Sequence, residues 1–222
     1  MTQAGINQAE KNGNGFSAFL LRKSRKTKGG KGMILETERL RMREMTMADY
    51  GAICRIMQDA ETMYAYEGAF TDGEVCEWIR RQENRYRELG FGLWAVERKE
   101  SGEVIGQCGL TMQPWREKQV LEIGYLFRRD CWGHGYATEA ARACKRYAFE
   151  QLGAEEVCSI IRDTNLASQR VALRNGMKPV DTWTKHYRGV DMPHIRYAVR
   201  KEDAEDDGST EAACMCMNSA ML

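Results

Sequence analysis

The most informative segment of the chain is residues 121–141, which read Leu-Glu-Ile-Gly-Tyr-Leu-Phe-Arg-Arg-Asp-Cys-Trp-Gly-His-Gly-Tyr-Ala-Thr-Glu-Ala-Ala. The first seven are apolar or aromatic apart from Glu122 and predict a buried strand. Gly133 and Gly135 interrupt it, and helix-forming residues follow from Tyr136. A strand that turns through Gly-x-Gly into a helix leaves unpaired main-chain N–H groups at the positive end of the helix dipole. The segment therefore predicts a site for an anion.

Two well-known phosphate motifs do not fit this segment. A P-loop requires Gly-Lys-Ser/Thr, and no lysine follows Gly135. A Rossmann fingerprint requires a third glycine, where Thr138 stands, and an acidic residue at the end of the next strand, which here comes only after a long helix. A nucleotide site of either type is not favoured.

The string Trp-Gly-His-Gly-Tyr-Ala-Thr-Glu-Ala (132–140) instead resembles the pyrophosphate loop of the GNAT acetyltransferases, in particular their RimJ/RimL-type branch. The superfamily pattern is Gln/Arg-x-x-Gly-x-Gly/Ala, and Asp130 departs from it at the first position. We expect Arg128 or Arg129 to supply the missing charge. The resemblance implies acetyl-coenzyme A as cosubstrate, held by Leu126, Phe127, Arg128, Trp132, Gly133, His134, Gly135, Tyr136, Ala137 and Thr138.

Composition limits the other functions open to the chain. Its 222 residues are 43% hydrophobic with a net charge of +1, which gives no electrostatic case for DNA or a membrane surface. No apolar run approaches the length of a membrane span. The eight cysteines are scattered without zinc-ribbon or disulfide spacing, so we expect no metal and a reducing, cytoplasmic setting.

The coarse pattern predicts one domain between two dissimilar ends. Residues 1–32 are a basic extension read as disordered or artefactual, residues 33–202 form the N-acetyltransferase domain, and residues 203–222 are a flexible tail. The expected order is βααβββαβαββ, with Thr46 and Thr71 as caps of the first two helices. That order is typical of an α/β protein of the GNAT fold, a mixed, mostly antiparallel central sheet flanked by helices on both faces.

A second motif, residues 165–177, follows a predicted strand and begins Asn-Leu-Ala-Ser. It is similar to the Asn-x-x-Ser…Gly-Phe string of the RimJ/RimL branch, with Met177 in place of phenylalanine. The resemblance implies that Asn165 binds the pantetheine arm and that Ser168 lies near the sulfur. The alternative is a simple helix cap in which Asn165 accepts from the N–H of Ser168. The tyrosine that many GNAT enzymes use to protonate the thiolate is absent, so Ser168 is the candidate donor.

The resemblance implies direct attack of an amine on the acetyl thioester. Glu122, the lone charge in an apolar strand, is our first candidate for the general base, because burial raises a carboxyl pKa. Glu67 is the second. We expect a main-chain N–H of Leu126 or Phe127 to stabilise the oxyanion. A nucleophilic Cys131 is disfavoured because it lacks a nearby base. The candidate substrate-binding residues are Tyr64, Glu67, Trp94 and His186.

The sequence thus predicts an N-acetyltransferase that moves an acetyl group from acetyl-coenzyme A to a primary amine. The acceptor is a protein N-terminus or a small-molecule amine, and a homodimer is left open. The alternative is a non-catalytic module that binds or senses coenzyme A.

Overall fold

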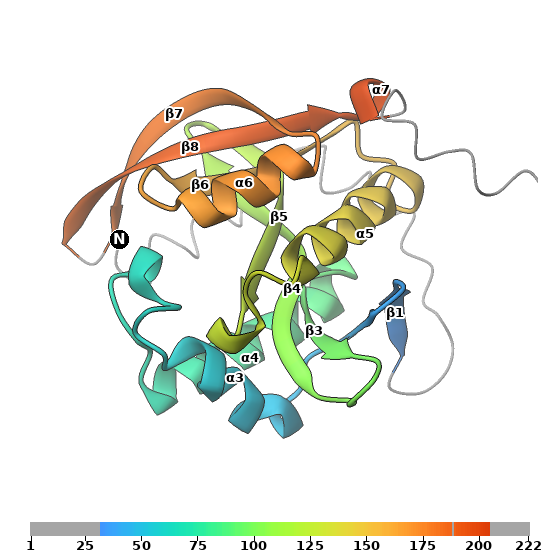
Figure 1. Ribbon diagram of the computed structural model, residues 1–222. Coiled ribbons are helices and arrows are strands. Elements are labelled where there is room, and N and C mark those ends of the chain that lie inside the picture. Colours follow the sequence, from blue (N-terminus) through green and yellow to red (C-terminus); the bar gives the residue numbers. More distant parts are fainter. Residues whose placement is uncertain (1–31, 188, 205–222) are drawn as a thin grey trace, which may run out of the picture.

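The computed structural model describes residues 32–187 and 189–204 (Figure 1). The strands are β1 (Met33–Glu36), β2 (Leu40–Arg43), β3 (Leu93–Arg98), β4 (Val104–Trp115), β5 (Lys118–Phe127), β6 (Glu156–Arg162), β7 (Lys178–Tyr187) and β8 (Val190–Arg200). The helices are α3 (Tyr50–Met57), α4 (Asp72–Leu89), α5 (Tyr136–Glu150), α6 (Leu166–Arg174) and α7 (Lys201–Ala204). The 3₁₀ turns are η2 (Met47–Asp49), η3 (Tyr64–Tyr66) and η4 (Arg129–Cys131).

In the described part of the chain, the eight strands form one sheet in the order β1-β2-β3-β4-β5-β6-β8-β7. Every neighbouring pair is antiparallel except β5 and β6, which run parallel because the connection through α5 crosses over. The sheet is therefore mixed and mostly antiparallel, as predicted.

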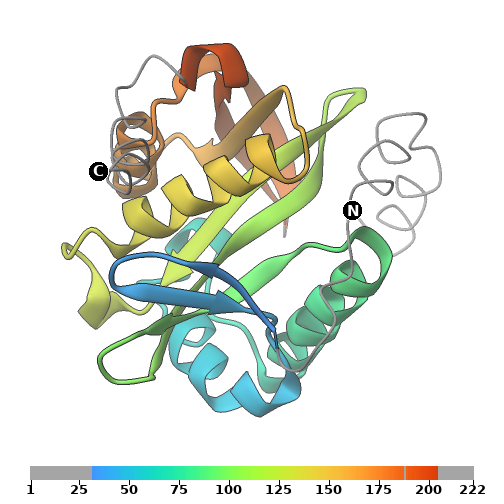
Figure 2. The ribbon, with the colours of Figure 1, turned by 90° about the vertical axis from the view of Figure 1, so that its right-hand side faces the viewer.

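Alternate residues of the strands pack into two separate cores. On one face, Trp94 and Ile123 lie in a cluster with Ala140, Cys144 and other residues of α5. On the other face, Ala95 packs against residues of α3 and α4 such as Ile56 and Ile79. Figure 2 shows α5 on one side of the green strands and α3 and α4 on the other. The predicted arrangement of helices on both faces is confirmed.

The first two helical regions begin as the sequence predicted. The Thr46 side chain accepts from the N–H of Ala48, while its own N–H donates to Asp49. Thr71 and Glu74 make the reciprocal hydrogen bonds of a capping box at the start of α4. Gly90, with φ +77°, ends α4 in the left-handed conformation.

One strand differs from the prediction. Met33–Glu36 forms an edge strand that pairs with β2 and precedes the seven strands of the predicted order. The segment 33–36 is too short for its apolar residues to show a period, so no strand was predicted there. The predicted basic extension and most of the predicted tail lie outside the described residues, and the proposed domain limits stay a prediction.

Candidate active site

The turn between β5 and α5 depends on the two glycines. Gly133 has φ +79° and Gly135, the N-cap of α5, has φ +81°, a region that disfavours residues with a Cβ. Trp132 closes the turn, because its indole N–H donates to the carbonyl of Phe127 at 2.8 Å. The end of the strand is thereby fixed against the start of the helix.

Six successive main-chain N–H groups in this turn, from Gly133 to Thr138, donate no hydrogen bond to any described residue; the next, at Glu139, bonds to Gly135. By contrast, side chains of Thr71 and Asn165 cap α4 and α6. A Cβ built on Gly133 meets no atom within 4 Å. The turn therefore presents free donors to open space, as an anion site requires.

A cation that the sequence did not indicate contacts this turn. Arg39, from the loop between β1 and β2, donates to the carbonyl of His134 at 3.0 Å, and its guanidinium lies 4.6 Å from the ring centre of Tyr136. It also forms an ion pair with Glu139 at 2.6 Å. The exposed ring of His134 packs at a tilt against Tyr136, with ring centres 5.8 Å apart.

The prediction that Arg128 or Arg129 supplies a free positive charge is wrong. Arg128 is bonded to Glu103 and Asp130, which raise the pKa of its guanidinium. Arg129 pairs with Asp59 and Glu61. Both charges are neutralised by carboxylates that come from elsewhere in the fold or from a neighbouring residue.

Beside the turn, β5 and β6 separate. Among the described residues they share one register pair, Glu122 with Cys158, followed by a hydrogen bond of 2.8 Å from the Ser159 hydroxyl to the carbonyl of Ile123. From Gly124 onwards β5 pairs with β4 alone. Residues 124–127 and 160–162 thus lie beyond the last ladder pair of the two strands, and we call this unpaired stretch the gap.

Strand alternation determines which amides face this gap. The Ile123 carbonyl points to β6, whereas the N–H of Arg128 bonds to Ile105 beside β4. Because successive residues point to opposite sides, the N–H groups of Tyr125 and Phe127 face the gap and that of Leu126 faces β4. Of the two residues predicted as oxyanion donors, Phe127 has the suitable orientation and Leu126 does not.

Glu122 lies at the apex of the gap. Its carboxylate accepts from the Thr111 hydroxyl and from the N–H of Ile160, both at 3.2 Å. Burial raises the pKa of Glu122, while nearby Lys185 and these hydrogen bonds oppose the rise. A carboxyl with a raised pKa, held where two strands diverge, is suited to accept a proton.

The sequence did not single out Lys185 on β7. Its ammonium group lies 5.7 Å from the ring centre of Trp115 and 5.9 Å from that of Trp183, and these two rings meet edge to face. Burial lowers the pKa of Lys185, and the charge of Glu122 opposes that effect. In the sequence it reads as an ordinary exposed cation of a strand, and no local pattern places it near Glu122.

The second motif lies across the gap from β5. Asn165 caps α6 by accepting from the N–H of Ser168 at 3.0 Å, which is the simpler of the two roles considered. The Tyr125 hydroxyl donates to the carbonyl of Ser168 at 2.9 Å and so ties β5 to α6. Asn165 and Ser168 are half-buried.

The four predicted substrate-binding residues do not form one group. Tyr64 and Glu67 lie together, because Arg162 at the end of β6 bonds to the carbonyl of Tyr64 and to the carboxylate of Glu67. His186 is exposed and bonded to Asp191 at 2.9 Å. Trp94 is fully buried against Tyr147, so its assignment to the substrate is wrong. Trp94 lies on a strand whose two faces are both covered.

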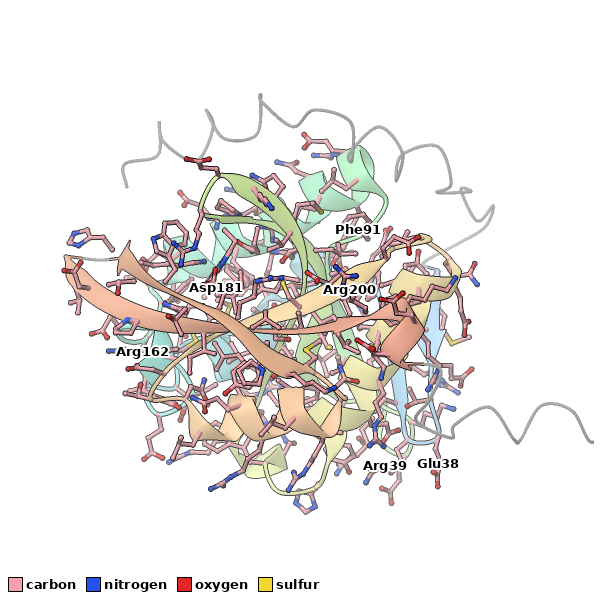
Figure 3. All side chains as sticks on the ribbon, turned by 90° about the horizontal axis from the view of Figure 1, so that it is seen from above. Glu38, Arg39, Phe91, Arg162, Asp181 and Arg200 are labelled. Carbon is pink, nitrogen blue, oxygen red and sulfur yellow. The ribbon has the colours of Figure 1, made fainter. Side chains whose placement is uncertain are left out.

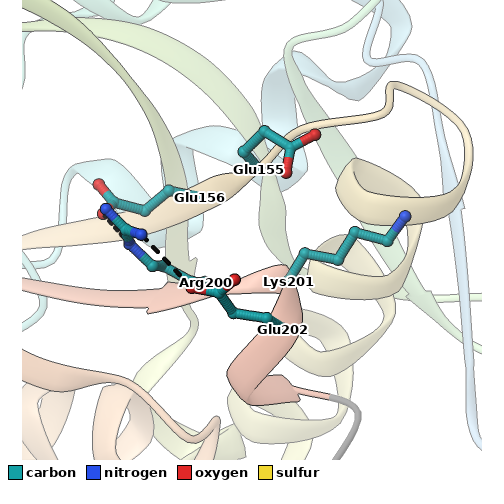
Figure 4. A pocket seen from close by; sticks show the side chains of 5 residues that line it. All are labelled: Glu155, Glu156, Arg200, Lys201 and Glu202. Atoms are coloured by element: carbon teal, nitrogen blue, oxygen red, sulfur yellow. Dashed lines mark hydrogen bonds and ion pairs between the residues drawn. The ribbon is translucent and has the colours of Figure 1, made fainter.

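Of two pockets in the described structure, one borders the glycine turn and the other does not. One, of about 490 Å³, lies where β6 begins, and Arg200 in it is paired with Glu156 and Glu202 (Figure 4). The other, of about 670 Å³, includes Gly135 and Thr138 of the glycine turn. Glu38 and Arg39, at the rim of this second pocket, lie well away from Asp181 and Arg162 in Figure 3.

In the part of the chain that the structure describes, no helix is long and apolar enough to cross a membrane. No group of three or more His, Cys, Asp or Glu side chains there is arranged to hold a metal ion.

A sequence model described as "Acetyltransferase (GNAT) domain" matches residues 39–178, more than half of the chain. The chain belongs to the GNAT acetyltransferase family. Enzymes of this family transfer an acetyl group from acetyl-coenzyme A, so of the two functions considered the chain is an acetyltransferase.

The chain is similar to other proteins over most of its length. The uncharacterized protein YkkB of Bacillus subtilis is 37% identical over 155 residues, covering 68% of this chain and 90% of that protein. FsC-acetyl coenzyme A-N(2)-transacetylase of Aspergillus fumigatus is 30% identical, covering 64% of each chain. The structure of RimL, the ribosomal L7/L12 α-N-protein acetyltransferase in complex with coenzyme A, matches with a TM-score of 0.64 at 15% identity, covering 78% of this GNAT chain and 99% of that one.

Proposed function

We propose that this GNAT acetyltransferase binds acetyl-coenzyme A in the gap between β5 and β6 and acetylates a primary amine with Glu122 as general base. The observation that supports this most is the row of free N–H groups from Gly133 to Thr138 directly beside the gap. These groups would hold the diphosphate. The pantetheine arm would then lie between the strands, where the N–H of Tyr125 offers a hydrogen bond in the manner of an added strand.

This arrangement would bring the thioester near the apex of the gap, beside Glu122. The N–H of Phe127 faces the gap and would donate to the carbonyl oxygen as it gains negative charge. The amine nitrogen attacks the carbonyl carbon, Glu122 accepts the proton that the nitrogen loses, and the C–S bond breaks to release the thiolate. Ser168, across the gap, would donate a hydrogen bond to that sulfur.

The acceptor would approach from the face of the sheet that carries Glu122 and Thr111. These two residues are directly opposite on β5 and β4, so their side chains share a face. Lys185, Trp115 and Trp183 stand on this side of Glu122. A primary amine of a protein N-terminus or of a small molecule remains the proposed acceptor class. RimL is named as an α-N-protein acetyltransferase, so N-terminal peptides are one set of acceptors to test.

Purified protein with radiolabelled acetyl-coenzyme A tests this proposal against a panel of amines and N-terminal peptides. We expect label transfer to at least one acceptor, with stoichiometric release of free thiol. The proposed base is refuted if Glu122→Gln transfers label as fast as the wild type, while Glu67→Gln serves as the control for the second carboxylate.

A further inference from the structure

The pocket of about 670 Å³ beside the glycine turn is rich in arginine. Arg39, Arg142, Arg146 and Arg174 line it, with Glu38 and Glu139 as its acidic members. It lies between the β1–β2 loop, the outer face of α5 and the end of α6. Four guanidinium groups against two carboxylates give the pocket a positive character.

Three of these arginines have no carboxylate partner among residues 32–187 and 189–204. Arg39 is already paired with Glu139, and Arg142 donates one N–H to the carbonyl of Arg174 at 3.0 Å. No ion pair joins Arg142, Arg146 or Arg174 to an acidic side chain of the described chain, and all three are exposed. Arg142 and Arg146 are four residues apart on α5, and like charges at that spacing repel each other. An anion bound between them would remove this repulsion.

The position of the pocket indicates which anion. It shares Gly135 with the turn proposed to hold the diphosphate. A rise of about 1.5 Å per residue places Arg142 about 10 Å beyond Gly135 along α5, and Arg146 one further turn away. Coenzyme A carries, besides its diphosphate, a phosphate monoester on the 3′-oxygen of its ribose. Such a group has a charge of about −1.5 to −2 at pH 7 and accepts several charge-assisted hydrogen bonds.

We propose that this pocket binds the ribose 3′-phosphate of coenzyme A through Arg142, Arg146 and Arg174. The inference rests on the proposed binding of coenzyme A at the glycine turn. It adds that the protein distinguishes coenzyme A from the form that lacks the 3′-phosphate. Arginine suits the task because its planar group binds two phosphate oxygens at once.

Isothermal titration calorimetry with coenzyme A and with 3′-dephospho-coenzyme A tests the inference. We expect the wild type to bind coenzyme A about tenfold more tightly, since exposed charge-assisted contacts are each modest and three act together. The variant Arg142→Gln/Arg146→Gln/Arg174→Gln should bind both carriers with the wild-type affinity for the dephospho form. Adenosine 3′,5′-bisphosphate should compete with coenzyme A better than adenosine 5′-monophosphate or inorganic phosphate.

Arg80→Gln is the matched control, because Arg80 is an exposed arginine of α4, on the opposite face of the sheet, with no ion pair in the described chain. It should retain the tenfold preference, and melting temperatures should show that all variants fold. Equal wild-type affinity for the two carriers overturns this inference and leaves the proposed function standing. A triple variant that weakens both carriers equally also overturns it. Failure of both carriers to bind overturns both proposals.

Discussion

Replacing Gly133 with valine should have a small effect on folding and a larger effect on the ability of the glycine turn to bind an anion. Gly133 has φ +79°, and an added Cβ meets no atom within 4 Å. The cost to folding is therefore backbone strain alone, about 1–3 kcal/mol for a β-branched residue in the left-handed region. For a chain of this size that cost corresponds to a fall of about 2–12 °C in Tm.

The cost to binding is larger. The valine side chain would occupy the open space into which the N–H groups of residues 133–138 point. Loss of two charge-assisted hydrogen bonds, at about 1.5–3 kcal/mol each, weakens coenzyme A binding about 100-fold or more. Calorimetric titration of the folded variant with coenzyme A measures this change directly.

Gly102 in the turn between β3 and β4 provides a matched control. It has φ +68°, and a Cβ there also meets no atom within 4 Å. Gly102→Val should lower Tm by a similar amount and leave the Kd for coenzyme A unchanged. If Gly133→Val melts like this control and binds coenzyme A with wild-type affinity, the glycine turn is not the anion site.

Three further results are expected. Glu122→Gln should lower kcat about 10²- to 10⁴-fold at saturating acetyl-coenzyme A with an unchanged Kd for coenzyme A. Burial raises the pKa of Glu122 above 4.5, and the base must be deprotonated to act. The wild-type rate should therefore fall as the pH decreases through this raised pKa, and the pH–rate profile of the variant should lack this acidic limb. Lys185→Met should move this acidic limb to higher pH, since the Lys185 charge lowers the pKa of Glu122. If the limb does not move, Lys185 lies too far from Glu122 to affect its pKa. Trp94→Ala should cost about 3–5 kcal/mol in urea unfolding, whereas Trp94→Phe should leave the KM for the amine unchanged if Trp94 has no contact with substrate.

Local signals in the sequence were sufficient for most elements. Residues 121–127 were predicted as a strand and lie within β5, because their apolar continuity is a local signal and the glycine turn follows them. Thr71 with Glu74 marked the start of α4 through side-chain chemistry within four residues. The glycine turn was found for the same reason, since the conformations of Gly133 and Gly135 are properties of the residues themselves.

Features that depend on distant contacts were not predictable in this way. Arg128 is neutralised by Glu103, which is 25 residues away, and no sequence pattern shows that pairing. Trp94 was misassigned because a strand buried on both faces lacks the alternation that separates an inward from an outward side chain. Lys185 lies near Glu122 only because β7 is brought beside the splayed strands by tertiary structure.

The junction between β5 and β6 has a consequence for the cooperativity of unfolding. In the described chain, a single ladder pair joins strands β1–β5 to strands β6–β8, so the two blocks share few of the main-chain bonds that make a sheet unfold as a unit. Amide hydrogen exchange along the inner edges of these blocks should proceed through a local opening of low free energy. A ligand that bonds to both edges would stabilise both blocks of strands. Protection of their amides from exchange would then rise in both blocks together.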